Sequence, residues 1–265
     1  MAVILPALAA ALTTALLALL GIRARAFRAA RNFEGLDVPI AGAAAAAGII
    51  AGLLAARVPD ATSRATLAAA LGFAFFGLLD DLYGDRSASG FLGHLGALRR
   101  GRVTTGAMKV LGGGLTALIA ARLLGAAGLP WLVEGAIIAL SANALNLVDT
   151  RPVRAAAVFL AAALFLWPYA PAAGCAAIPA AAVWLPFDRR RIAMLGDAGS
   201  NALGAILGVW VAEASGFRAA LGVLIALIAF HAWTEGHSIN RAIAANPRLD
   251  RLDGWMRGEG RPRSG

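Results

Sequence analysis

Cysteine, histidine and lysine are nearly absent from the 265-residue sequence. The single Cys175 excludes an intramolecular disulfide, and the three scattered histidines do not combine with it into a Cys/His metal site. Charged residues are scarce as well, at 15% of the chain compared with roughly 25% in soluble domains. This scarcity of charge excludes an ordinary soluble domain.

Apolar residues take the place of the missing charge. The chain is 60% hydrophobic with a mean hydropathy of +0.73, and several apolar stretches are long enough to cross a hydrocarbon core of about 30 Å. The sequence therefore predicts an all-α polytopic membrane protein that forms a single domain over residues 1–265. In such a protein the excess of basic residues behind the net charge of +9 sets the orientation of the helices in the membrane and attracts anionic lipid. We therefore expect no nucleic-acid partner.

The hydropathy pattern predicts nine transmembrane helices with the N-terminus outside. No basic residue precedes the first apolar run, which favours a spanning helix over a cleaved signal peptide. A polar loop is expected over 32–42, running into the second helix, a longer one over 80–104 and a polar cytoplasmic tail over 235–265. This topology places 20 basic residues on the cytoplasmic side and four on the other side, as the positive-inside rule requires. The nine expected ranges are about 2–21, 38–56, 65–79, 105–124, 131–148, 153–167, 171–187, 199–214 and 217–234.

Two adjacent carboxylates, Asp80 and Asp81, follow the third apolar run. An ionised Asp at the centre of a membrane helix costs roughly 2.5–3.5 kcal/mol, so acidic residues near a span usually have a function. A divalent cation would relieve the repulsion between the two charges, and Mg²⁺ prefers such oxygen ligands. The alternative is a solvated loop that begins just after a helix.

The fifth expected helix ends in Asn143, Asn146 and Asp149, spaced three residues apart. This spacing places two amides and a carboxylate on one helix face, where they could bind a nucleotide and a cation. The alternative is that the amides bond neighbouring helices to one another.

Two further motifs are expected at cytoplasmic helix ends. The segment GDAGS (196–200), with Gly196, Asp197 and Ser200, enters the eighth helix, where backbone N–H groups favour phosphate. The segment TTGAMK (104–109) carries Lys109, the one lysine among 24 basic residues, within reach of a pyrophosphate. The alternatives are a Gly-Ser turn with an N-cap Asp and a snorkelling interfacial lysine.

The ordered set DD, TTGxxK, NxxNxxD and GDxGS resembles the polyprenyl-phosphate N-acetylhexosamine-1-phosphate transferases, the MraY/WecA-like superfamily or glycosyltransferase family 4. The likeness runs from VPIAG (38–42) to the tail. It implies a Mg²⁺-dependent (or Mn²⁺-dependent) phosphoglycosyltransferase of the bacterial inner membrane with a cytoplasmic active site. Such an enzyme transfers a sugar-1-phosphate from a UDP-sugar to polyprenyl (undecaprenyl) phosphate, releases UMP in cell-envelope glycan synthesis, and can form a homodimer.

The resemblance also implies roles for individual residues. Asp80, Asp81 and Asp197 match the catalytic carboxylates, and Asp197, Asp81 and Asp149 the metal ligands. Asn146 and Asp149 would match nucleotide-site residues, and Lys109 a phosphate-facing lysine. From their positions we also expect substrate contacts from Asn143, Gly196 and Ser200, and from the two arginines that this chain gains relative to the family, Arg151 and Arg154.

The sequence departs from this family in three places. Residues 150–154 read TRPVR where the family usually reads GxDG or GxNG, which removes an acidic or amide residue at 152 and adds Arg151 and Arg154. Residues 234–257 replace a His-rich loop, and the chain has nine expected spans where MraY has ten. These differences indicate a variant subgroup. The alternative function is an inactive homologue that acts as a membrane transporter or lipid-carrier scaffold.

Overall fold

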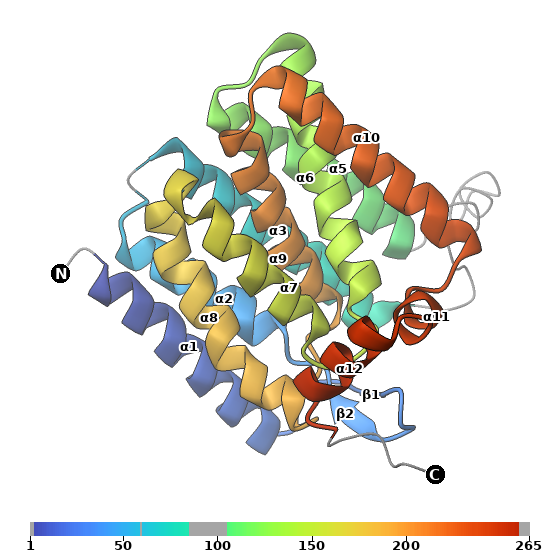
Figure 1. Ribbon diagram of the computed structural model, residues 1–265. Coiled ribbons are helices and arrows are strands. Elements are labelled where there is room, and N and C mark those ends of the chain that lie inside the picture. Colours follow the sequence, from blue (N-terminus) through green and yellow to red (C-terminus); the bar gives the residue numbers. More distant parts are fainter. Residues whose placement is uncertain (1–2, 59, 85–104, 260–265) are drawn as a thin grey trace.

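The computed structural model describes residues 3–58, 60–84 and 105–259 as a bundle of helices (Figure 1). Within these ranges the only sheet is an antiparallel hairpin of β1 (Ala29–Arg31) and β2 (Asp37–Pro39). The helices in chain order are α1 (Ile4–Arg23), α2 (Ala43–Ala55), α3 (Ala61–Tyr83), α5 (Thr105–Leu124), α6 (Gly128–Val148), α7 (Arg154–Leu166) with the 3₁₀ turn η1 (Trp167–Tyr169), α8 (Pro171–Arg189), α9 (Gly196–Ala214), α10 (Phe217–Gly236), α11 (Ile239–Ala244) and α12 (Pro247–Met256).

The prediction of an all-α membrane protein is confirmed in its general form. In the described part of the chain, five helices are long and apolar enough to cross a membrane: α1, α3, α5, α6 and α10. Helices α2 and α7 are apolar but short, and α8 and α9 do not meet the same criterion. Each of the nine expected ranges nevertheless contains a helix.

Helix α9 forms the centre of the bundle. It packs along α3 and α6 and also contacts α7 and α2, and most of its side chains are buried. Glycines allow the close approach: a Cβ added at Gly208 would lie 2.6 Å from the Cα of Ile138 in α6. Trp210 is fully buried and donates its indole N–H to Thr66 Oγ1 of α3. The residues that begin α9 are therefore held at a fixed position relative to α3 and α6.

The end of α3 differs from the prediction. Asp80 and Asp81 do not begin a loop, because the helix continues through Tyr83. Two contacts explain the extra turn: Arg28 donates to the carbonyls of Asp81 and Leu82, at 3.1 and 2.8 Å, and the Asp81 side chain bonds α9. The rest of the predicted loop, 85–104, lies outside the described residues.

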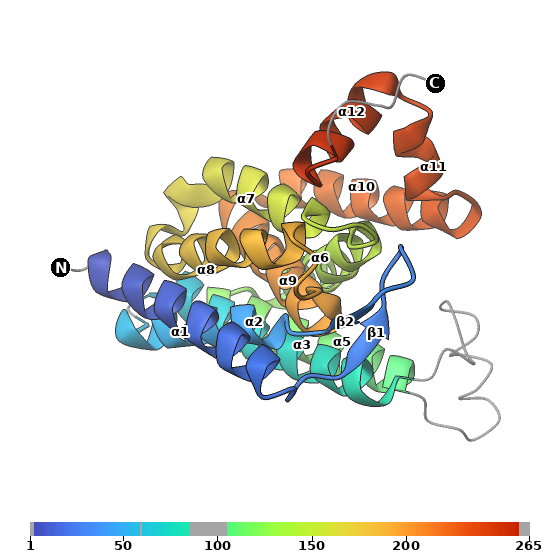
Figure 2. The ribbon, with the colours of Figure 1, turned by 90° about the horizontal axis from the view of Figure 1, so that it is seen from below.

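A hairpin of two strands and two short helices were absent from the prediction. The β1–β2 hairpin overlaps the polar loop expected over 32–42, and the tail contains α11 and α12. Figures 1 and 2 show the hairpin, α11 and α12 at one end of the bundle, whereas the N-terminus lies at the other end of α1. The acidic and basic candidate residues lie at the end that carries the hairpin and the tail.

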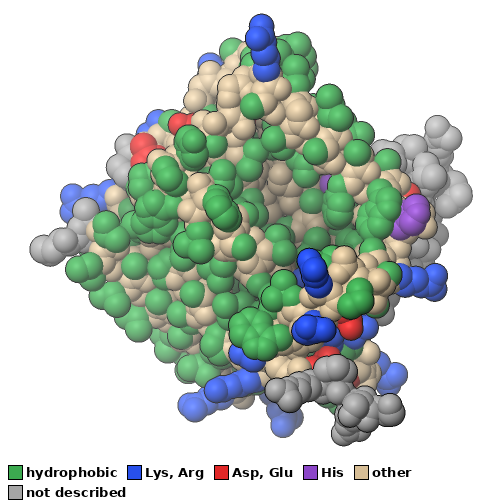
Figure 3. Space-filling model, viewed as in Figure 1, with side chains coloured by type: hydrophobic (Ala, Val, Ile, Leu, Met, Phe, Trp, Pro, Cys, Tyr) green, Lys and Arg blue, Asp and Glu red, His purple; other side chains and the backbone are tan. Residues whose placement is uncertain are grey.

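The surface agrees with a membrane environment. Hydrophobic side chains cover most of the face seen in Figure 3, and many large ones on α1 and α5 are exposed. Helix α10 packs mainly on α6, and of its apolar side chains only Ala220 is fully buried, while large ones such as Ile225 and Ile228 are exposed. Exposing these apolar side chains to water would cost free energy, whereas exposing them to lipid tails, which are equally apolar, does not.

Candidate functional site

Asp81 links the end of α3 to the beginning of α9. Its two carboxylate oxygens accept hydrogen bonds from the backbone N–H groups of Asp197 and Ala198, each at 2.9 Å. Gly196 adopts a left-handed φ of +62°, and a Cβ there would meet Ile40 and the Asp81 carboxylate. The GDAGS turn therefore fits closely against the Asp pair because it begins with glycine.

Lys109 lies between the two other carboxylates. Its Nζ forms an ion pair with Asp197 Oδ2 and lies 3.9 Å from Asp80 Oδ2. All three side chains are largely shielded from solvent. The predicted phosphate-facing lysine and two of the predicted catalytic carboxylates thus meet at one point, between α3, α5 and α9.

Asn146 completes this cluster. The Ser200 hydroxyl, with its single proton, donates to the Gly196 carbonyl at 2.7 Å, so it must accept from Asn146. With the amide turned accordingly, the Asn146 nitrogen donates to Ser200 Oγ at 2.7 Å and to Asp197 Oδ1 at 3.2 Å, and its oxygen accepts from Lys109 at 3.1 Å. The NxxNxxD and GDxGS motifs are thus joined by direct hydrogen bonds.

A cavity of about 580 Å³ opens from this cluster toward the hairpin. Its volume is in the range typical of sites for small organic ligands. Both acidic side chains and arginines line it. We call this space the polar cavity; its charged lining residues are Arg28, Arg31, Asp80, Asp81, Asp149, Arg151, Asp188, Arg191 and Asp197.

A second cavity of about 820 Å³ lies on the other side of Asp80, toward α10. Most of its wall is apolar; its polar lining residues are Asp80, Lys109, Asn143, Asn201, His231, Thr234 and Glu235. We call it the apolar cavity; its larger apolar lining residues are Phe73, Val110, Leu140, Leu147 and Ile228. Asp80 lines both cavities, whereas Asp197 lines the polar one and Lys109 the apolar one.

Asp149 follows α6 and lines the polar cavity. Burial raises the pKa of its carboxyl well above the ordinary value, and the charges of Asp188, Asp197 and Asp81 raise it further. Among the described residues, however, no three Asp, Glu, His or Cys side chains are gathered like the ligands of one ion. Asp81, Asp149 and Asp197 share one region without forming a closed metal cage.

The two predicted arginine contacts differ in position. Arg151 lines the polar cavity, and its guanidinium lies 4.2 Å from the centre of the Phe33 ring. Arg154 is 4% exposed and is not among the residues that line either cavity. Its guanidinium instead pairs with Asp253 of α12.

Several residues of the site were not singled out from the sequence. Phe33, Arg28 and Arg191 line the polar cavity, and His231 lines the apolar one. The arginines were assigned only to membrane orientation, and His231 was treated as one scattered histidine. No periodicity indicated that a hairpin would carry Phe33 to this end of the bundle.

No protein-family model matches the chain, and no curated protein matches it.

Proposed function

We propose that the chain is a phosphoglycosyltransferase that moves a sugar-1-phosphate, N-acetylhexosamine-1-phosphate in our assignment, from a UDP-sugar to polyprenyl phosphate. The observation that carries the proposal is the meeting of two different cavities at Asp80, Lys109 and Asp197. A reaction between a polar nucleotide sugar and a lipid phosphate needs such a junction. We place the chain in the bacterial inner membrane with nine spans, the N-terminus outside and the site cytoplasmic.

The polar cavity suits the donor. Its arginines offer bidentate hydrogen bonds to phosphate, whereas the N–H groups of Asp197 and Ala198 at the start of α9 already donate to Asp81. Asp149 presents carboxylate oxygens that can bind hydroxyl and N–H groups of a nucleotide, and Asn146, which lines neither cavity, holds Lys109 and Asp197 in place. In this assignment Arg151 contacts the donor, and Arg154 acts through the turn that carries Arg151.

The apolar cavity suits the acceptor. Its wall matches a hydrocarbon chain, and its polar lining residues include Lys109, a point charge that can attract the lipid phosphate. Helix α10, which borders this cavity, buries few side chains fully, and we expect its exposed face to contact lipid. A membrane-embedded substrate can therefore reach the junction from the side.

In the proposed reaction an oxygen of the lipid phosphate attacks the β-phosphorus of the donor. A new P–O bond forms, the bond to the bridging oxygen breaks, and UMP leaves with that oxygen. We assign to Asp80 the role of accepting the proton of the lipid phosphate, because both Asp81 oxygens already accept hydrogen bonds from N–H groups of α9. Lys109 offsets the charge that builds up on the transferring phosphate.

The carboxylate oxygens at the junction are suitable ligands for Mg²⁺, and Mn²⁺ uses similar ligands. Mg²⁺ commonly binds proteins through one or two carboxylates and takes its remaining ligands from water and substrate phosphates, so no closed cage is required. Asp197 and Asp149 would hold it, with Asp81 keeping the α9 terminus in place. Bound there, the ion would neutralise pyrophosphate charge.

The test uses purified protein with undecaprenyl phosphate, Mg²⁺ and a panel of UDP-sugars, and follows the release of UMP. We expect release with at least one donor, lowered at least about 100-fold by Asp197→Asn. Glu213→Gln, at the far end of the same helix, is the matched control and should keep full activity. Absence of release with every donor, with ligand binding unchanged in Asp197→Asn, would refute an enzyme and favour the scaffold or transporter alternative.

A further inference from the structure

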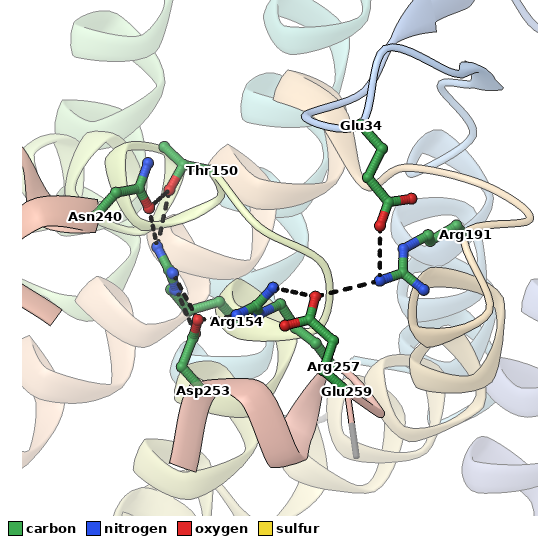
Figure 4. A network of polar contacts seen from close by, with 8 residues as sticks. All are labelled: Glu34, Thr150, Arg154, Arg191, Asn240, Asp253, Arg257 and Glu259. Atoms are coloured by element: carbon green, nitrogen blue, oxygen red, sulfur yellow. Dashed lines mark hydrogen bonds and ion pairs between the residues drawn. The ribbon is translucent and has the colours of Figure 1, made fainter. Parts of the chain in front are cut away.

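The C-terminal helices α11 and α12 contact the turn between α6 and α7 through buried charge. Arg154 Nε and Nη2 donate to Asp253 Oδ1 and Oδ2, at 2.9 and 3.0 Å, in a two-pronged ion pair (Figure 4). Only 5% and 7% of the two side chains are exposed. The two parallel hydrogen bonds fix the relative orientation of the side chains. Removing either partner is costly, because the other charge would remain buried without a partner.

Neutral groups extend the same contact. Arg154 Nη1 donates to Thr150 Oγ1 at 2.9 Å and to Asn240 Oδ1 at 2.8 Å, and the Thr150 hydroxyl donates to Asn240 at 3.0 Å. Residues of α11, α12 and the turn 149–154 thus share one hydrogen-bonded network. Asp253 also accepts from Arg257, 3.0 Å away. Burial alone would raise the pKa of Asp253, but Arg154 and Arg257 outweigh it and hold the pKa below its ordinary value.

The turn needs such support. Val153 has a left-handed φ of +72°, a conformation that is unfavourable for a β-branched residue. Its N–H donates to Asp188 Oδ2 of α8 at 2.7 Å, which holds the turn from one side. The Arg154–Asp253 pair holds it from the other side. A backbone conformation of this kind persists only where the surroundings impose it.

A third contact joins the tail to the hairpin. Arg191 lies 3.0 Å from Glu34 and 3.4 Å from Glu259, and these partners come from the hairpin and from the chain after α12 (Figure 4). The ring of Phe33 in the hairpin lies against Arg151 of the turn. The turn and the hairpin line the polar cavity, and the tail is bonded from outside the cavity to the turn directly and to the hairpin through Arg191.

We propose that α11 and α12 position one wall of the polar cavity, and that the Arg154–Asp253 pair is the contact through which they act. The wall consists of Thr150, Arg151 and Pro152, which line the cavity, whereas Arg154 and Asp253 do not. Both are positioning residues. Their effect on the donor rests on the proposed function, but their effect on the turn does not.

The test compares the full-length protein with Asp253→Asn, Arg154→Gln and the double variant Arg154→Met/Asp253→Leu. The matched control is Asp250→Asn, an exposed acidic residue of the same helix. Hydrogen exchange of residues 149–154 and the KM and kcat of UMP release are measured for each. If Arg154→Gln does not accumulate in cells, the result for Asp253→Asn is used to test the proposal, because this substitution changes only a helix outside the spanning bundle.

We expect the single variants to speed exchange in the turn at least 10-fold and to raise the donor KM at least 10-fold, with a smaller change in kcat. The double variant leaves neither member of the pair buried without its partner. Its exchange rate in the turn and its donor KM should therefore be closer to those of the unmodified protein than the values of either single variant. Unchanged exchange in the turn would overturn the proposal. If the unmodified protein releases no UMP, the proposed function fails, and hydrogen exchange still decides whether the pair holds the turn.

Discussion

Lys109 is the residue at which composition and geometry agree. It is the one lysine among 24 basic residues, and its ammonium lies between Asp80 and Asp197 with the Asn146 amide beside it. An ammonium is a compact charge that can contact several oxygens from different directions, whereas a guanidinium is a wide planar group. The pocket between α3, α5 and α9 matches the smaller group.

We therefore predict that Lys109→Arg lowers UMP release roughly 10–100-fold, although the charge is kept. The control is Arg122→Lys, which makes the opposite exchange at the exposed far end of the same helix and should leave the rate unchanged. Full activity of Lys109→Arg would show that the junction needs only a positive charge.

The two neighbouring aspartates show how far the sequence could lead. Their side of the bundle and their nearness to Asp197, Asn146 and Lys109 could be predicted from motif order. Their different tasks could not, because these depend on the direction of each side chain on the last turn of α3. Asp81 bonds the backbone of α9, whereas Asp80 faces both cavities. The contact of Arg154 could not be predicted either, since its partner Asp253 is 99 residues away in the sequence.

At the scale of elements, helix ends rather than helix interiors determine the site. Helices α3, α6 and α9 bring their polar ends together, and small residues along their interiors set how closely they approach. Gly77 is the clearest example: a Cβ there would contact the backbone carbonyl of Asp197 and the Cα of Ala198. A backbone contact cannot be relieved by a side-chain rotation.

We predict that Gly77→Ala destabilises the folded protein by about 1–3 kcal/mol, as over-packing does, and also lowers activity by moving Asp197. Thermal unfolding in detergent measures the first effect and UMP release the second. The matched control is Gly222→Ala on α10, where a Cβ would meet no atom within 4 Å. Equal stability of the two variants would contradict a tight α3–α9 contact at this point.

Hydropathy could predict the nine helical ranges, because a run of apolar residues bounded by polar ones has few other solutions in a membrane. It could not predict the hairpin, whose three-residue strands are too short for a periodic pattern. It also could not predict that α11 and α12 fold onto the turn after α6. That arrangement depends on the side-chain pairs of Arg154 and Arg191, which only the folded chain brings together.

At the scale of the whole molecule, the hairpin, which lines the polar cavity, and the start of α1 lie at opposite ends of the bundle (Figure 1). From the positive-inside count we expect the cavity end to face the cytoplasm. The two observations are independent, since one rests on charge along the chain and the other on the packing of helices. Together they predict the membrane side of each exposed position.

The prediction can be measured with single cysteines in a Cys175→Ala background. Gly216 lies between α9 and α10 at the end away from the cavity, and Arg248 is exposed on α12. With a membrane-impermeant maleimide, Gly216→Cys should be labelled in intact cells, and Arg248→Cys only after the membrane is opened. Cys175 is 5% exposed among small residues, so its replacement by Ala should not disturb the bundle. Labelling of Arg248→Cys in intact cells would put the polar cavity outside, where UDP-sugars are not made, and would exclude the proposed reaction.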